Sequence, residues 1–435
     1  MKLYNTLTGK KEDFQPLDGK TVRVYVCGMT VQDSPHLGHL RVFTVFDTLY
    51  RFFKVLNWDV KAVQNFTDID DKIIRKARDE GVDWRVIADR YENEYREVAK
   101  LMNFLPIFHP RATQHIQEIV EMIQRIIENG YAYVSGGNVW FSVRKFAEDY
   151  GYGVLSKMSL DDMLAGARVE PEPTKKDPLD FALWKAKKEG EPYWPSPWGD
   201  GRPGWHIECS AMSSKHLGLP FDIHGGGRDL IFPHHEDEIA QTKGATGKEF
   251  ARFWVHVGLL TISGEKMSKS LKNYFLAKEA LKDFHPSAIR LLLLSAHYRN
   301  DLEFYPEKLK EFSKSYANLY ESLKDVSGER DKALWDELVE ILKDDFNTPE
   351  FFATVFKNLE SKNKNILFTL RGFLENLGFV FRETGEDLVL KRLIEIRDLA
   401  RREKNYDLAD KVREILKLAG VELMDTPEGT KFRIL

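Results

Sequence analysis

The segment IFPHHEDEIAQ, at residues 231–241, concentrates side chains that can bind a metal or carry charge. If a helix begins at Pro233, His234 and Glu238 are four residues apart and face the same way, as two ligands of one metal would. A charged helix face is the alternative. A zinc protease motif, H-E-x-x-H, would need a second histidine where the sequence has Ile239. Any metal site must therefore draw its other ligands from elsewhere in the chain.

A second group of candidate residues follows the short apolar run VRVYVCG, in the segment CGMTVQDSPHLGHLRV. We expect Ser34 to cap a helix and Pro35 to occupy its first position, which places His36 and His39 on one face of the first turn. A helix N-terminus at the carboxyl end of a parallel strand attracts anions, and two imidazoles add donors for phosphate oxygens. Gly38 would let a nucleotide lie close. Taken alone, two histidines at this spacing are more often surface residues.

A third candidate is the loop GEKMSKSLKN at residues 264–273, in which Lys266 and Lys269 are separated by Met and Ser. Mobile lysines could close over a triphosphate and neutralise the charge that builds up as pyrophosphate leaves. An isolated Lys-Ser stretch is more commonly a solvated basic loop. The interpretation therefore depends on the loop occurring together with the two histidines.

The elements that would position these residues alternate between strand and helix in the N-terminal third, which predicts a βαβ unit and a parallel sheet. Between about residues 106 and 200 the pattern changes to a helix, a hairpin and the Pro- and Lys-rich VEPEPTKKDP, which is typical of an insertion. We expect the sheet to resume near Trp205, so that Cys27 and Cys209 both lie at ends of sheet strands, where ligand sites collect. From about residue 275 onward amphipathic helices dominate.

Composition narrows the classes of protein that remain. The 435 residues suffice for two or three domains, and two cysteines cannot form a disulfide framework. No stretch approaches the roughly 18 apolar residues of a membrane span, and the N-terminus lacks the apolar core of a signal peptide. We expect a cytoplasmic protein with no membrane role. The net charge of -4 does not decide whether a polyanion binds, because binding depends on local basic faces.

HLGH, followed about 230 residues later by KMSKS, resembles the signature pair of class I aminoacyl-tRNA synthetases. Other segments narrow the resemblance to the cysteinyl-tRNA synthetases and extend it over nearly the whole chain: YVCGMTVQD, NFTDIDDKII, DFALWK, GRPGWHIECSAM, DIHGGGRDLIFPHHEDEIAQ, KMSKSLKN, LLSAHYR, DDFNTP and MDTPEGTKFR. The departures from the family pattern are Met29, Gln32, Leu37, Val257 and Phe432. None removes a charged or metal-binding group, so they affect fine contacts rather than activity.

The resemblance implies a zinc site, with one Zn²⁺ per chain, formed by Cys27, Cys209, His234 and Glu238. Zinc accepts sulfur, nitrogen and oxygen ligands in tetrahedral geometry. It would also explain how cysteine is selected over serine, because an ordinary pocket separates such near-isosteres only about ten- to a hundredfold. Without the resemblance, two lone cysteines would be better interpreted as buried core residues.

The resemblance also implies the remaining site residues. The groups expected to stabilise charge on ATP, which binds with Mg²⁺, are His36, His39, Lys266 and Lys269. The further nucleotide contacts expected are Gly28, Gly38, Gly225, Gly226, Met267, Ser268 and Ser270. The residues similar to those that line the family's cysteine pocket are Thr67, Trp205 and His224.

The implied activity is ATP-dependent activation of L-cysteine to cysteinyl-adenylate and transfer to tRNA(Cys), by a monomer. Residues 391–417 hold nine basic residues against six acidic ones, and the terminal hairpin offers Phe432 for stacking. This region suits an anticodon-binding module, although a solvated helix face explains the same excess. Two other functions stay open: a zinc-dependent ligase that passes cysteine to a small amine, as in mycothiol synthesis, and a non-enzymatic nucleotide- or RNA-binding protein.

We therefore expect an α/β protein with a Rossmann-type parallel-sheet catalytic domain containing an insertion, followed by an α-helical bundle and a small C-terminal mixed α/β module. The expected boundaries are 1–110 and 196–260 for the two halves of the catalytic domain, 111–195 for the insertion, 261–310 for the KMSKS loop and stem-contact region, 311–388 for the tRNA-binding bundle and 389–435 for the anticodon-binding module.

Overall fold

The computed structural model describes residues 1–166, 172–267, 274–381, 385–419, 421–426 and 429–434. The chain divides into two compact units, Met1–Phe379 and Val380–Leu435. No helix among the described residues is long and apolar enough to cross a bilayer.

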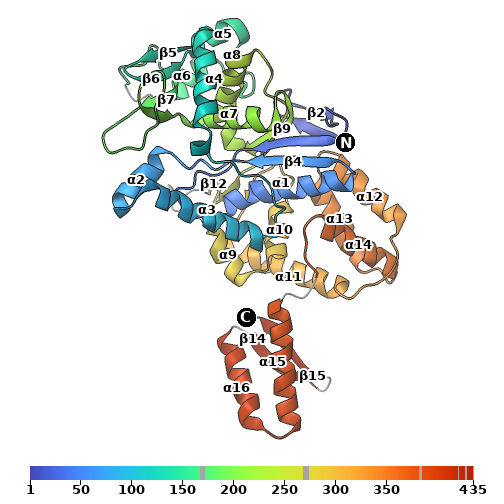
Figure 1. Cartoon of the computed structure of the whole chain (residues 1–435). Helices are drawn as coiled ribbons and strands as arrows, with labels where there is room; N and C mark the ends of the chain where they lie inside the picture. The colour runs from blue at the N-terminus through green and yellow to red at the C-terminus, as the bar shows by residue number, and fades with distance from the viewer. Residues whose placement is uncertain (167–171, 268–273, 382–384, 420, 427–428, 435) are drawn as a thin grey trace. The chain divides into compact units, whose positions relative to one another are not determined.

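A parallel four-stranded sheet forms the centre of the first unit (Figure 1). Its strands are β3 (Thr21–Val26), β4 (Asp59–Gln64), β9 (Phe221–Gly227) and β10 (Ala251–Val257), in the order β10-β9-β3-β4. Every residue of β9 is buried, as expected for a strand of a parallel sheet that is covered on both faces. The order and direction of the strands confirm the predicted Rossmann-like α/β architecture.

Helix α1 (Leu37–Val55) connects β3 to β4, as predicted, but the expectation for its start was wrong. Its N-cap is His36, not Ser34. The residues just before it pair in an extended conformation with the segment before α9: the Leu37 N–H donates to the Phe275 carbonyl, and the Pro35 carbonyl accepts from the Ala277 N–H. These tertiary hydrogen bonds delay the helix, which local sequence signals could not reveal.

The predicted insertion is present as an antiparallel sheet with helices. Its elements are α4 (Ile116–Glu128), β5 (Ala132–Ser135), β6 (Asn138–Phe141), α5 (Val143–Tyr150), α6 (Leu160–Gly166), β7 (Phe181–Ala186) and β8 (Gly201–Pro203). The parallel sheet was expected to resume near Trp205, but it resumes at Phe221. Helix α7 (Trp205–Leu217) lies between them, and because it is buried nearly all round it lacks the apolar stripe by which a surface helix is recognised.

The remaining elements of the first unit are mainly helices. They are α2 (Asp71–Glu80), α3 (Trp84–Leu101), α8 (Glu236–Thr246), α9 (Ala277–Asp283), α10 (Pro286–Leu294), α11 (Pro306–Leu323), α12 (Lys332–Lys343), α13 (Thr348–Leu359) and α14 (Lys364–Asn376). Short strands complete it: β1 (Lys2–Asn5), β2 (Lys10–Asp13), β11 (Leu260–Ile262), β12 (Glu265–Lys266) and β13 (Leu302–Glu303). The amphipathic helices expected after residue 275 are confirmed.

The second unit contains two helices followed by a β-hairpin, as the sequence predicts. Its elements are α15 (Gly385–Arg402), α16 (Tyr406–Leu418), β14 (Val421–Thr426) and β15 (Gly429–Ile434). A small apolar core of Ile394, Val412, Leu416 and Val421 holds the helices and the hairpin together.

Candidate functional site

The four residues expected to bind a metal lie together in the first unit. Cys27 directly follows β3, Cys209 lies in α7, His234 lies in a π-helical turn, and Glu238 lies in the first turn of α8. One ligand atom from each falls within 4.8 Å of the others, and all four side chains are buried. The expectation that Cys209 lies at a strand end was wrong. Cys209 lies on a buried helix, α7, whose second turn reaches Cys27 at the carboxyl end of β3.

The distances within this cluster suit a shared cation. The two Sγ atoms are 3.7 Å apart, and His234 Nε2 is 2.8 Å from Glu238 Oε1. Burial alone would raise the pKa of the Glu238 carboxyl, but the neighbouring histidines hold that pKa well below its usual range. Burial and the hydrogen bond to Cys209 raise the pKa of the Cys27 thiol. Two sulfurs, one imidazole and one carboxylate form a donor set that fits a metal such as zinc.

Two histidines beside the cluster form a second possible ligand set, which the sequence reasoning did not identify. His224 and His235 gather with Cys27 and Glu238 within the same 4.8 Å limit. His235 Nε2 is 3.3 Å from Cys27 Sγ, and His224 Nε2 is 2.6 Å from Glu238 Oε2. The adjacent histidines His234 and His235 could have indicated this second set, but helical spacing pairs only His234 with Glu238.

Outer hydrogen bonds orient the imidazoles. His206 Nδ1 lies 2.8 Å from His234 Nδ1, and His206 Nε2 lies 3.3 Å from Asp237. His235 Nδ1 lies 2.8 Å from His256 Nε2. Burial lowers the pKa of His256 to about 3 and that of His206 well below its usual value, so both rings are neutral near pH 7. Neutral, oriented imidazoles around a ligand set are the usual arrangement of a metal centre.

The three residues expected in the cysteine pocket lie at or near the cluster. The Trp205 ring stacks on His234 at a centroid distance of 4.3 Å and is 39% exposed, so it lies between the cluster and solvent. His224 is fully buried against Glu238. Thr67 Oγ1 donates to Glu208 Oε2 at 2.9 Å, and its neighbour Asn65 contacts Cys209.

The two histidines of HLGH lie at the N-terminus of α1. Their rings stack with centroids 3.8 Å apart. His36 Nδ1 accepts from the Gly38 N–H at 3.1 Å, and His39 Nδ1 accepts from the His36 N–H at 3.3 Å. Because each Nδ1 is an acceptor, the proton of each neutral ring sits on Nε2. Both Nε2–H groups can therefore donate to an anion at the helix N-terminus.

The start of the lysine loop lies beside this helix. A Cβ placed on Gly38 would be 4.0 Å from Met267 Cβ, so the two motifs meet as expected. Lys266 Nζ forms an ion pair with Asp229 Oδ2 at 2.5 Å, and its side chain is 46% exposed. Met267 is buried, and its N–H donates to the Leu260 carbonyl. Ser268, Lys269 and Ser270 lie outside the described residues, and Phe432 is described only as part of the backbone of β15.

Two of the glycines expected to contact the nucleotide, Gly28 and Gly225, are required by the packing of the chain itself. A Cβ on Gly28 would lie 1.7 Å from the Asn65 carbonyl oxygen, and one on Gly225 would lie 2.1 Å from Phe46 Cζ. On Gly226 the nearest atom would be Leu230 Cδ1 at 2.9 Å. Their contact with a nucleotide stays a prediction.

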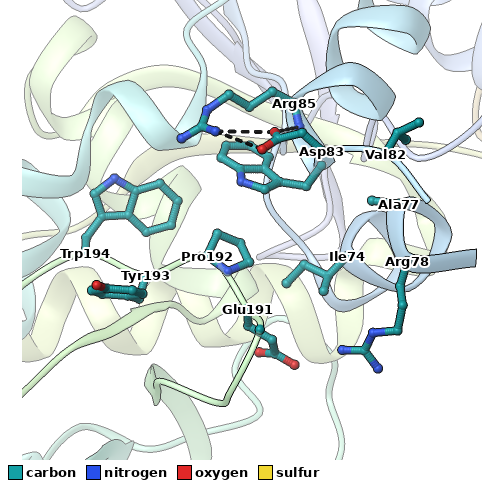
Figure 2. Close-up of a pocket in the computed structure, with 12 residues that line it drawn as sticks. Ile74, Ala77, Arg78, Val82, Asp83, Arg85, Glu191, Pro192, Tyr193 and Trp194 are labelled. Carbon is teal, nitrogen blue, oxygen red and sulfur yellow. Dashed lines mark hydrogen bonds and ion pairs between the residues drawn. The ribbon is translucent and has the colours of Figure 1, made fainter. Parts of the chain in front are cut away.

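Two cavities are lined in part by residues of the insertion. One of about 1050 Å³ is lined by residues of the insertion, such as Trp140 and Lys185, and by Trp205 and Asp237, which neighbour the candidate metal ligands in the sequence or contact them. The other, of about 540 Å³, lies between the α2–α3 junction and residues 190–194, and its wall includes Arg78 and Tyr193 (Figure 2). None of the candidate site residues lines the smaller cavity.

Comparison with known proteins gives a consistent result. A family model for the class I (C) tRNA synthetase catalytic domain matches residues 13–314. Cysteine–tRNA ligase of Persephonella marina is 46% identical over 486 residues, covering 100% of this chain and 99% of the relative. That of Thermotoga maritima is 44% identical over 462 residues, covering all of both chains.

A solved structure supports the fold. Mycobacterium tuberculosis methionyl-tRNA synthetase in complex with methionyl-adenylate superposes with a TM-score of 0.61 at 16% identity, over 82% of this chain and 89% of that one. The family model, the full-length relatives and this fold agree with the buried cluster of Cys27, Cys209, His234 and Glu238. The chain therefore belongs to the cysteine–tRNA ligases of the class I aminoacyl-tRNA synthetases.

Proposed function

We infer that this chain activates L-cysteine with ATP and transfers it to tRNA(Cys). The observation that carries this function is the buried Cys₂-His-Glu donor set, whose Cys27 follows β3 in the connection that leads to the N-terminus of α1. The first element can recognise a thiol and the second can bind phosphate, so one site can hold both substrates of an activation reaction.

We propose that Cys27, Cys209, His234 and Glu238 hold one Zn²⁺ per chain. Zinc is borderline-soft and binds a thiolate far better than an alcohol, which is the property that would separate cysteine from serine. The protein's own contribution is to keep the neighbouring imidazoles neutral and water scarce. His224 and Trp205 would enclose the substrate, and Thr67 would form the wall near Asn65 and Cys209.

Activation joins the cysteine carboxylate to the α-phosphorus of ATP, with pyrophosphate leaving in line and Mg²⁺ accompanying the nucleotide. The Nε2–H groups of His36 and His39 would donate to phosphate oxygens. Lys266 would exchange Asp229 for a phosphate, and Lys269 and its neighbours Ser268 and Ser270 would complete the closing loop. Gly28, Gly38, Gly225, Gly226 and Met267 would line the nucleotide site. The adenylate then loses its acyl group to a ribose hydroxyl at the 3′ end of tRNA.

The parts outside the sheet domain would bind the tRNA. Residues 261–310 would contact the stem, the bundle of 311–388 would follow it, and 389–435 would bind the anticodon end. We propose that the enzyme acts as a monomer in the cytoplasm. A ligase that passes cysteine to a small amine would have no use for the C-terminal unit, which aligns over its full length with relatives named for tRNA charging.

Cysteine-dependent exchange of pyrophosphate into ATP tests the first step, and charging of tRNA(Cys) tests the second. We expect exchange with cysteine, at most trace exchange with serine at equal concentration, and charging of the tRNA. Exchange without any charging, together with transfer to a small amine, would favour the alternative ligase. Absence of cysteine-dependent exchange in zinc-loaded protein would exclude both.

A further inference from the structure

Arg41 is a fully buried arginine that forms no ion pair with a carboxylate of the described residues. It lies in the second turn of α1, just beyond HLGH, and is 0% exposed. Its guanidinium donates to four backbone carbonyls: Gly258 at 3.1 Å, Leu293 at 2.9 Å, Asn300 at 2.7 Å and His297 at 3.4 Å. The ion pairs of the described part of the chain include none to Arg41. Burying a charged side chain without a counter-ion costs free energy, so we expect Arg41 to have a role other than packing.

The first of these carbonyls belongs to the base of the hairpin that carries Lys266. Gly258 lies between β10 and β11, and its N–H donates to the Tyr298 carbonyl at 2.7 Å. A Cβ at Gly258 would lie 2.2 Å from the Asn300 carbonyl oxygen, so only glycine allows this approach. The chain then runs through β11 and β12 to Lys266.

The other carbonyls belong to the segment 293–301, which braces the same base. The acid there, Asp301, forms no ion pair with Arg41, although its charge acts on the guanidinium and opposes the lowering of its pKa by burial. Its Oδ1 accepts from the Leu259 N–H at 2.7 Å, and both its oxygens pair with Arg228. Arg41 therefore joins three pieces of backbone, namely α1, the β10–β11 connection and the end of α10. No other residue type offers five donors in one planar group for this purpose.

We propose that Arg41 is a positioning residue of the nucleotide site, which fixes the base of the hairpin carrying Lys266 relative to His36 and His39 and contributes a positive charge, not held in a direct ion pair, that favours the ATP phosphates. The proposal deepens the function inferred above and rests on it. The guanidinium is attached about 6 Å along α1 from its first residue, by the helical rise per residue. A cation inside the protein that is paired only with carbonyls keeps its field, whereas one paired with a carboxylate loses most of it.

Protonation does not limit this role. Burial lowers the pKa of Arg41 to about 10, which still leaves the side chain charged at neutral pH. The charge is therefore present whenever the enzyme works.

Arg290, on α10, provides a matched control that contacts the later part of α1. It is also a fully buried arginine, it also donates to backbone carbonyls, at Leu377 and Met102, and it also contacts α1 through Thr48. It differs in being paired with a carboxylate, Asp47, at 2.7 Å. Its contacts lie away from the Gly258 hairpin base, so its loss should disturb packing without disturbing the nucleotide site.

The test compares Arg41→Met, Arg41→Lys and Arg290→Met in cysteine-dependent pyrophosphate exchange, at a temperature where each is folded. For Arg41→Met we expect the KM for ATP to rise and kcat to fall roughly tenfold each, while the KM for cysteine stays within about twofold. Arg41→Lys keeps the charge but has only three donors, so its KM for ATP should recover while its kcat stays low. Arg290→Met should lower the melting temperature and leave the three kinetic parameters near those of wild type.

The outcomes separate the inference from the function on which it rests. Exchange by wild type establishes the activity whatever the variants do. Equal kinetic changes in Arg41→Met and Arg290→Met, or an unchanged KM for ATP in Arg41→Met, would overturn the role of Arg41. If Arg41→Met does not fold, Arg41→Lys decides alone: a low kcat with a normal KM for ATP supports the role, and wild-type kinetics overturn it.

Discussion

At the scale of single residues, the candidate metal site combines two thiols and a carboxylate whose anionic forms would repel one another without a shared cation. Cys27 and Cys209 approach to 3.7 Å as free thiols, and Glu238 is fully buried among them. A cation reverses the effect of burial on a thiol, because coordination stabilises the thiolate. Binding of a metal would therefore offset the free-energy cost of bringing these groups together.

Cys209→Ser should lose most of the zinc, because an alcohol is a much poorer ligand than a thiolate. Metal content per chain, measured by plasma mass spectrometry after gel filtration, tests this. Ser210→Ala is the control, because Ser210 is equally buried on α7 and its hydroxyl has no hydrogen-bond partner in the described structure. A Cys209→Ser protein with one zinc per chain would contradict the ligand assignment.

His109 gives a second residue-scale prediction, for pH dependence. Its Nδ1 lies 2.8 Å from the Gln64 carbonyl and its ring stacks on Phe66, and burial lowers its pKa to about 4. The folded pKa lies below the unfolded value of about 6.5, so the stabilisation is present above pH 6.5 and is lost as pH falls towards 4.

His109→Gln should therefore reduce the loss of unfolding free energy between pH 7 and pH 5 by on the order of 1 kcal/mol. Urea unfolding of wild type and His109→Gln at pH 7 and pH 5 gives the change in unfolding free energy of each protein. Subtracting one change from the other removes the contribution of the other buried histidines, which both proteins share. An identical pH dependence in the two proteins would show that His109 is not held neutral by the fold.

At the scale of elements, the sequence predicted what local patterns encode. The apolar run of β3, the amphipathic α1, the antiparallel hairpin of the insertion and the C-terminal hairpin are all present. The sequence-based prediction was wrong where tertiary contacts set the position or type of an element. The sheet is expected to resume near Trp205, where α7 forms instead; this helix is buried on most sides, so it lacks the one-sided apolar stripe of a surface helix. Helix α1 starts after its predicted cap because Pro35 and Leu37 form hydrogen bonds with another segment. Neither signal is local.

Gly225 shows the same limit and carries an element-scale prediction. The sequence predicts that Gly225 approaches a nucleotide, but the absence of a Cβ also has a packing reason. A Cβ built there would lie 2.1 Å from Phe46 Cζ of α1 and 2.9 Å from the Val255 carbonyl oxygen of β10. Gly225→Ala should push α1 from the sheet and cost about 1–3 kcal/mol of stability. Gly372→Ala is the control, since a Cβ there meets nothing within 4 Å and lies inside α14, where alanine should be neutral or stabilising by up to about 1 kcal/mol. Thermal unfolding of the two variants should give opposite shifts, and equal shifts would contradict the packing argument.

At the scale of the whole molecule, the metal cluster is assembled from distant segments, and this explains why its ligands were found by resemblance rather than by spacing. Cys27 and Cys209 are separated by 182 positions and meet only because the chain passes through the whole insertion and returns beside β3. Only His234 and Glu238 show their relation locally, through helical spacing. The tRNA-binding role proposed for the C-terminal regions is encoded even less directly, since a modest basic excess on two helices is compatible with a plain solvated surface.

The last prediction uses the division of the chain into two units. A protein ending at Phe379 retains the metal cluster, His36, His39 and the lysine loop, and lacks α15, α16 and the hairpin. Cysteine-dependent pyrophosphate exchange should survive in this fragment, because the first unit is compact in itself. Circular dichroism and zinc content check that it is folded.

Charging of tRNA(Cys) by the same fragment should fall sharply. The lost unit is proposed to hold the anticodon end, and removing several phosphate contacts should cost a few kcal/mol of tRNA affinity and weaken its dependence on salt concentration. Filter binding at two salt concentrations measures both effects, with the full chain as reference. If the folded fragment bound and charged tRNA as well as the full chain does, the second unit would have no part in tRNA recognition, and transfer of cysteine to a small amine would again have to be considered, because the main argument against it is the presence of that unit.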